Sequence, residues 1–167
     1  MIKFEKPVYK VVDYIDSKSF GKFELEPLER GFGTTIGNAL RRIMLSSMPG
    51  SAIVAVKIDG VMHEFQTIDG IVEDVTTIVL NLKNVVLKNK SEDVKKLSLH
   101  ADKEGVVTAG DIDKDSDIEI INPNQEIATL AKGGKLNMDI IIANGRGYVP
   151  ANDNKKFIHV FFDSYIL

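Results

Sequence analysis

The sequence contains no cysteine, no excess of basic residues and no long apolar run, and each absence narrows its function. Without cysteine the chain forms no disulfides, thiolate zinc sites or iron–sulfur clusters, which fits a reducing cytoplasm. Its net charge of −3 argues against general nucleic-acid binding, because a surface that follows phosphates usually has a basic excess. No apolar run approaches the roughly 20 residues that span a bilayer. The opening MIKFEKPVYK lacks the apolar segment of a signal peptide, so none is expected.

What is present resembles an ordinary folded protein in composition. The 167 residues are enough for one large domain or two small ones. Hydrophobic residues make up 44% of the chain and charged residues 27%, which is typical of globular proteins. We therefore expect most of the chain to be folded.

The first third of the chain predicts a hairpin followed by a helix. Alternating apolar residues predict strands over residues 8–16 and 19–26. Apolar side chains at helical spacing predict a helix over residues 34–47, and Pro49 disfavours its continuation.

The next segments predict a strand, a turn and a second helix. Residues 51–58 read as a strand, and the Asp-Gly turn at 59–60 predicts a partner strand over 61–65. Helical spacing predicts a helix over residues 70–83, with Glu73 and Asp74 in its first turn, where the helix dipole favours anions.

The rest of the chain consists of short β-prone segments separated by polar or glycine-containing turns. We expect strands at residues 85–88, 95–101, 105–110, 117–122, 126–131, 135–143 and 156–162. The order of elements predicts an α+β fold in which helices pack on mostly antiparallel sheets.

Three glycines near the first predicted helix raise the question of a phosphate-binding loop. A dinucleotide fingerprint would need its third glycine at position 36, where the chain has Ile36, and an apolar strand before it. A Walker A loop would need lysine and a hydroxyl where the chain has Ile-Gly-Asn. We therefore interpret Gly31 and Gly33 as allowing an unusual backbone, and Gly37 as allowing close packing. A nucleotide-binding enzyme is the alternative from another functional class.

Neither the acidic run nor the histidines form a metal-binding motif. An EF-hand loop starting at Asp111 would need glycine and glutamate where the chain has Ser116 and Asn122, so residues 111–122 are predicted to form a solvated turn. The histidines fall on separate predicted strands without ligand-like spacing. They are His63, His100 and His159.

The first predicted helix has apolar residues on two sides. Its main apolar face contains Ile36, Ala39, Leu40, Ile43, Met44 and Ser47. At 100° per residue, Leu45 lies about 180° from Ile36. Arg41, Arg42 and Asn38 surround Leu45. An ordinary helix on its own core is the default interpretation, but an apolar centre with arginines is typical of a protein interface. The pattern predicts a helix used on both sides.

Four segments of the sequence resemble the bacterial RNA polymerase alpha-subunit family. They are LEPLERGFGTTIGNALRRIMLSSMPGSA, IDGVMHEFQTIDGIVEDVTTIVLNLKNV, VTAGDI and GRGYVPA. They occur in the order and spacing of that family, and the resemblance extends over about residues 7–165.

The resemblance implies an architecture and a role. Residues 1–50 and 157–167 would form a dimerisation subdomain of sheet and helix, incomplete at its C-terminal end, and residues 51–156 an inserted, mostly antiparallel β subdomain. The chain would dimerise and scaffold the beta and beta′ subunits of DNA-directed RNA polymerase, a nucleotidyltransferase complex in the bacterial cytoplasm, or in a plastid. It would hold no catalytic residue and no cofactor, because the magnesium of the complex belongs to beta′. A paralogous scaffold that never meets a polymerase is the second alternative.

The resemblance also assigns interface residues. The dimer interface would contain Phe32, Ile36, Leu40 and Ile43. The beta-subunit interface would contain Asn38, Arg41, Arg42 and Leu45. The beta′-subunit contact would be Lys83, with a plain surface lysine as the alternative.

The C-terminal end departs from the family. The chain ends at FFDSYIL, where the family continues into a second long dimerisation helix, a linker and a DNA-binding domain. We therefore expect a fragment or a truncated reading frame, with neither direct DNA contact nor membrane contact. Loss of the second helix would expose apolar surface on the first and favour aggregation.

Overall fold

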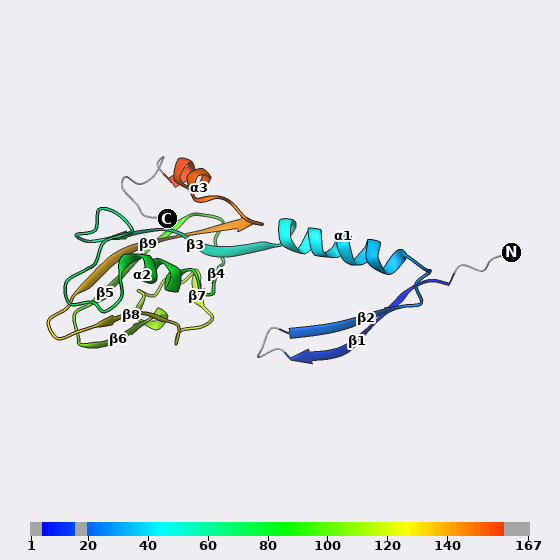
Figure 1. Cartoon of the computed structure of the whole chain (residues 1–167), viewed down its shortest axis with the longest axis horizontal. Helices are drawn as coiled ribbons and strands as arrows, with labels where there is room; N and C mark the ends of the chain where they lie inside the picture. The colour runs from blue at the N-terminus through cyan, green and yellow to red at the C-terminus, as the bar shows by residue number, and fades with distance from the viewer. Residues whose placement is uncertain (1–4, 16–19, 159–167) are drawn as a thin grey trace. The chain divides into compact units, whose positions relative to one another are not determined.

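The computed structural model describes residues 5–15 and 20–158 of the chain. It divides into two compact units, Met1–Leu45 and Ser46–Leu167 (Figure 1). Several predictions lie partly outside the described residues: position 16 of the first strand, position 19 of the second, and positions 159–162 of the last, including His159.

The first unit begins with the predicted hairpin. Strands β1 (Val8–Ile15) and β2 (Phe20–Glu26) pair antiparallel. Val11 lies opposite Phe23 and Tyr9 opposite Leu25, so one face of the hairpin is apolar. The other face is mostly polar, with Lys10 opposite Glu24 and Asp13 opposite Lys22, and it ends with Ile15 opposite Phe20.

Helix α1 (Phe32–Ser47) follows the hairpin and starts two residues earlier than predicted. Gly31 has φ +92°, which confirms that it provides a left-handed backbone at the helix start. The same interpretation is wrong for Gly33, which lies within the helix. Apart from the helix's own backbone, no atom of the described residues would lie within 4 Å of a Cβ added at Gly37, so the described part of the chain does not require the predicted close packing there.

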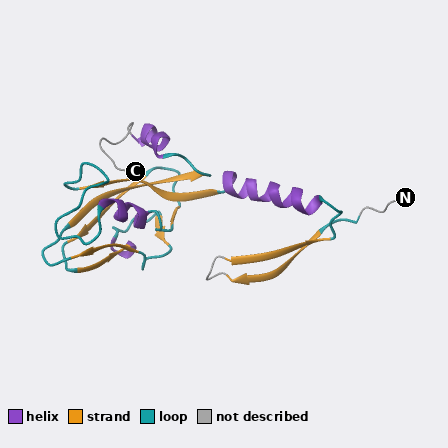
Figure 2. Cartoon of the chain, viewed as in Figure 1, coloured by secondary structure: helices purple, strands orange, loops and turns teal. Residues whose placement is uncertain are grey.

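The second unit is built of antiparallel sheets joined by loops and short helices (Figure 2). A three-stranded sheet has the order β3–β9–β5, formed by β3 (Pro49–Ile58), β9 (Leu136–Arg146) and β5 (Lys95–Ala101). One two-stranded sheet pairs β4 (Leu87–Asn89) with β7 (Ile118–Ile120). Another pairs β6 (Gly105–Thr108) with β8 (Glu126–Leu130), and a 3₁₀ turn, η2 (Ala109–Asp111), follows β6. The α+β prediction is confirmed.

Helix α2 (Val75–Leu82) starts five residues later than predicted. Asp74 caps it by accepting the backbone N–H of Thr77 at 2.7 Å. Hydrogen bonds from the side chain and then the backbone of Thr77 lower the pKa of Asp74. Glu73 lies before the helix and Asp74 is its N-cap, so the predicted place of both residues in the first turn is wrong. Its carboxylate instead accepts the backbone N–H and the hydroxyl of Thr129, at 2.6 and 2.9 Å.

The strand predicted over residues 61–65 is absent from the structure, although the preceding turn is present with Gly60 at φ +77°. Gln66 holds this segment as a loop. Its Oε1 accepts the N–H of Met62 at 3.1 Å, and its Nε2 donates to the carbonyl of Gly60 at 3.0 Å. His63 lies in this loop and not on a strand.

Among the residues that the structure describes, every buried apolar side chain lies in the second unit. Buried apolar side chains run from Ala55 to Ile142, and Ile78, Leu99 and Ile140 are fully enclosed. Two glycines permit a close backbone approach beside this core. A Cβ on Gly134 would lie 2.1 Å from the carbonyl oxygen of Gly70, which no side chain tolerates.

Helix α3 (Ala151–Ile158) occupies the start of the last predicted strand. The strand prediction is therefore wrong for residues 156–158. The carbonyl of Pro150 accepts the N–H groups of Asp153 and Asn154, which closes the first helical turn. None of the helices among the described residues has the length and apolarity needed to cross a membrane.

Candidate functional site

Helix α1 presents an apolar stripe that the described part of the chain leaves uncovered. None of its sixteen residues is buried. Phe32, Leu40 and Ile43 are 48, 54 and 58% exposed, and Ile36 is half-buried. Burying exposed apolar surface contributes a favourable free energy of about 25 cal/mol per Å². The stripe is therefore a strong candidate for contact with another molecule.

The opposite side of α1 carries the second predicted set of residues. The helix is continuous from Phe32 to Ser47, so the angular positions predicted at 100° per residue apply. All four residues on this side are exposed: Asn38, Arg41, Arg42 and Leu45. The structure thus places each predicted set together, on its own side of one helix.

The hairpin of the first unit also exposes apolar surface. Tyr9, Val11 and Phe23 lie on its apolar face and are all more than half exposed. Sequence alternation identified these strands but gave no sign that both would stay unburied. The first unit therefore has two uncovered apolar surfaces, one on the helix and one on the hairpin.

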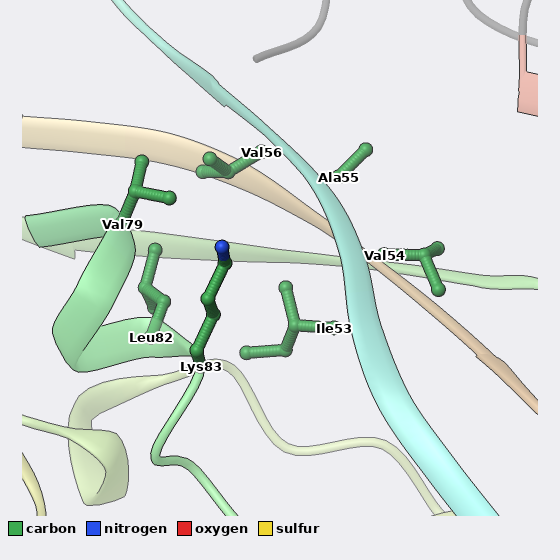
Figure 3. A pocket seen from close by; sticks show the side chains of 7 residues that line it. All are labelled: Ile53, Val54, Ala55, Val56, Val79, Leu82 and Lys83. Atoms are coloured by element: carbon green, nitrogen blue, oxygen red, sulfur yellow. The ribbon is translucent and has the colours of Figure 1, made fainter. Parts of the chain in front are cut away.

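Lys83 belongs to the second unit and closes α2. It is the C-cap residue, and its backbone N–H donates to the carbonyls of Val79 and Asn81. Its side chain is exposed and stands at a small hollow (Figure 3). The hollow is lined by Ile53, Val54, Ala55, Val56, Val79, Leu82 and Lys83. Sequence reasoning found only Lys83, because residues 53–56, which are distant in sequence, form the opposite wall.

The acidic run binds its own chain. Asp115 accepts the N–H of Asp117 at 2.8 Å, and Lys95 lies close to both carboxylates. The hydrogen bond to Asp117 raises the pKa of Lys95. Within residues 5–15 and 20–158, no three His, Asp or Glu side chains are grouped so as to hold a metal ion.

Comparison with known proteins identifies the family to which the sequence belongs. A family model described as "RNA polymerase Rpb3/RpoA insert domain" matches residues 56–166, more than half of the chain. The chain belongs to the bacterial-type RNA polymerase alpha-subunit family.

Individual members of the alpha-subunit family are closely similar. A protein of Symbiobacterium thermophilum named "DNA-directed RNA polymerase subunit alpha" is 58% identical over 155 residues, which is 93% of this chain and 49% of the relative. A protein of the same name from Oceanobacillus iheyensis is 55% identical over 156 residues, 93% of this chain and 50% of the relative. The chain thus spans about half the length of these relatives.

Proposed function

We propose that this chain is a non-catalytic assembly subunit of DNA-directed RNA polymerase that dimerises and scaffolds the beta and beta′ subunits. The observation that supports this most is α1, whose apolar stripe and arginine-bearing side both lie unburied in the described chain. A helix of this kind gains stability when another chain covers it. The names of the two relatives supply the polymerase context.

Each side of α1 receives one partner in this proposal. A second copy of the chain covers Phe32, Ile36, Leu40 and Ile43. The beta subunit covers Asn38, Arg41, Arg42 and Leu45. Arginine suits the second role because its planar guanidinium makes several directed hydrogen bonds at an interface.

The remaining assignments follow from the same proposal. Lys83 contacts beta′, and residues 51–156 form the inserted subdomain, while residues 1–50 and 157–167 belong to the dimerisation subdomain. The boundary between the two compact units, after Leu45, lies close to the proposed subdomain boundary after residue 50. The chain contributes no catalytic residue and no cofactor to the nucleotidyltransferase reaction, and it acts in the bacterial cytoplasm without contacting DNA itself.

Co-purification of the beta subunit with the tagged chain tests the proposal. Arg42→Ala should weaken beta binding by about 30-fold, the effect of losing an interface residue worth about 2 kcal/mol. Arg30→Ala is the matched control, since Arg30 is an exposed arginine in the turn before α1. Its affinity for beta should stay within about twofold of wild type.

Two results would contradict the proposal. Unchanged beta binding by Arg42→Ala would show that this side of α1 is not the beta interface. A chain that dimerises but retains neither beta nor beta′ would be a paralogous scaffold.

A further inference from the structure

Strand β1 has a sequence that is nearly the same in both directions. It reads VYKVVDYI, so a branched aliphatic residue stands at each end, a tyrosine next to each end and two valines at the centre. The remaining positions hold charges of opposite sign, Lys10 and Asp13. Such a strand can pair with an antiparallel copy of itself, because residues of matching chemistry then face one another.

One register of two β1 strands matches every position. When the centre of the pair lies between the two valines, Lys10 of one copy is opposite Asp13 of the other, and Tyr9 is opposite Tyr14. A two-fold axis repeats each of these contacts. A slip of one residue places Asp13 opposite Tyr9, or Lys10 opposite Tyr14, so the neighbouring registers lose both kinds of contact.

A β-bulge in β1 makes this register geometrically possible. Facing residues of paired strands share one face of the sheet, but Tyr9 and Tyr14 are an odd number of positions apart and would lie on opposite faces of a regular strand. The pairing of β1 with β2 shifts at the centre of β1, so that Tyr9 lies opposite Leu25 and Tyr14 opposite Gly21. Leu25 and Gly21 are an even number of positions apart on β2. Both tyrosines therefore lie on the same face of the hairpin.

The bulge also brings the two charges of β1 onto one face. Lys10 and Asp13 lie opposite Glu24 and Lys22, which share a face of β2 by the same alternation. The Lys10 ammonium contacts a carboxylate oxygen of Glu26 at 2.6 Å, and the Lys10 side chain is still 62% exposed. Asp13 is exposed as well. The charged groups are thus accessible to a second copy of the strand.

The outer edge of β1 is available for pairing. Within residues 5–15 and 20–158, β1 pairs with β2 alone (Figure 1). Tyr9 and Tyr14 are 71 and 63% exposed, so the rest of the chain encloses neither. Edge strands often carry a charge or a bulge that prevents unwanted pairing. In β1 the charges and the bulge fit the self-complementary register and oppose its neighbours.

We propose that the edge of β1 is a self-association surface that pairs with β1 of a second copy of this chain. The two hairpins then form one antiparallel sheet, with the β1 strands adjacent at its centre. Eight residues of β1 meet from each copy, fewer than the roughly 20–30 of a standard interface, so this contact is weaker than the one proposed at α1. It forms at higher protein concentrations and needs neither α1 nor a polymerase subunit.

Sedimentation equilibrium of two charge variants tests the register. All chains carry Ile43→Asp, so that the proposed α1 contact does not contribute. Lys10→Glu and Asp13→Lys each place like charges opposite one another, and each should weaken self-association by about tenfold. An equal mixture of the two variants should return to within about twofold of the Ile43→Asp chain, because every introduced charge then faces the opposite charge.

Lys22→Glu is the matched control for the charge variants. Lys22 is exposed and lies opposite Asp13 within the hairpin, but it belongs to β2 and not to the proposed contact. Its self-association should stay within about twofold of the Ile43→Asp chain. If the charges act only on the stability of the hairpin, all three variants will associate equally weakly and mixing will restore nothing, which would overturn the inference.

Cysteine cross-linking tests the pairing directly, since the chain has no cysteine of its own. Val8 and Ile15 face one another across the proposed pair, where Cα atoms about 4.5–5.5 Å apart are within the range of a disulfide. A mixture of Val8→Cys and Ile15→Cys chains should form a disulfide-linked dimer under mild oxidation. Neither variant alone should do so, because two copies of the same position would lie about 20 Å apart.

The outcomes separate this surface from the one proposed on α1. Weak association that persists in the Ile43→Asp chain and is lost on adding Lys10→Glu belongs to β1. No association of the Ile43→Asp chain at any concentration would overturn the inference and leave the α1 contact standing. A disulfide that forms as fast in either cysteine variant alone as in the mixture would also overturn it.

Discussion

The two units of the chain use apolar side chains in opposite ways. In residues 46–158 they form a core in which Ile78, Leu99 and Ile140 are wholly enclosed. In residues 5–15 and 20–45 no residue is buried, although aromatic and aliphatic side chains are plentiful there. The second unit therefore has a hydrophobic core of its own, whereas the first exposes the kind of apolar surface that often marks an interaction site.

Helices α1 and α2 show the same contrast. Helix α2 has eight residues and buries three of them, Val75, Ile78 and Leu82. Helix α1 has sixteen residues and buries none. Helices in proteins depend mainly on tertiary packing of their apolar side, so α1 is the element that has most to gain from a second chain.

The largest expected difference between the units concerns core substitution. Leu99→Ala should lower the free energy of unfolding by about 2–5 kcal/mol, because Leu99 is fully buried and its loss leaves a cavity. Leu40→Ala should change it by less than about 0.5 kcal/mol, because Leu40 is more than half exposed. Urea unfolding at protein concentrations below that of dimerisation measures both. Equal losses of unfolding free energy in the two variants would contradict the contrast between a buried core and an exposed surface.

Glycine substitution should give effects of opposite sign in the two units. Gly134→Ala should destabilise the second unit by about 1–3 kcal/mol, since its Cβ would meet the backbone of Gly70. Gly37→Ala should stabilise the monomer by up to about 1 kcal/mol, because it lies within α1 with open space around it. Thermal unfolding of both variants checks this. A destabilised Gly37→Ala monomer would show that the chain itself packs against that position.

The smallest expected effect is electrostatic and depends on pH. Partial burial raises the pKa of Asp139, but hydrogen bonds from Lys96 and Ser98, with the charge of Lys57, outweigh it and lower the pKa overall. A lowered pKa adds stability above the unfolded value near 3.9, and this stability is lost as pH falls through the folded value.

Asp139→Asn should therefore cost less than about 1 kcal/mol at pH 7 and still less at about pH 3. Urea unfolding at the two pH values gives the comparison. In the first unit, Glu26→Gln should have a smaller effect, because the Lys10–Glu26 pair is more exposed. A cost for Asp139→Asn that grows toward low pH would contradict the expected direction of the pKa shift.

Sequence periodicity was sufficient to predict the helices and strands whose bounds depend on neighbouring residues in the sequence. The hairpin, α1 and β3 lie within about two residues of their predicted bounds. Their alternation, helical spacing and Pro49 are all local features. The two predicted sides of α1 also follow from spacing alone, once the helix is continuous.

The errors occur where contacts that the local pattern does not show decide the structure, and some of these contacts are distant in sequence. The predicted partner of β3 after the Asp-Gly turn is a loop held by Gln66, and β3 pairs instead with β9, about 90 residues later. Residues 70–74, predicted as helix, precede α2, and Ile71 forms a β-bridge with Leu130 instead. The hollow at Lys83 joins β3 to the end of α2, and no local pattern predicts it.

Sedimentation equilibrium of two matched variants tests the central claim that a second copy covers the apolar stripe of α1. Ile43→Asp and Leu45→Asp make the same change at residues that are 58 and 62% exposed on opposite sides of the helix. Ile43→Asp should weaken the dimer by about 30-fold or more, while Leu45→Asp leaves it intact. A dimer that survives Ile43→Asp, or that is lost equally in both variants, would contradict the account.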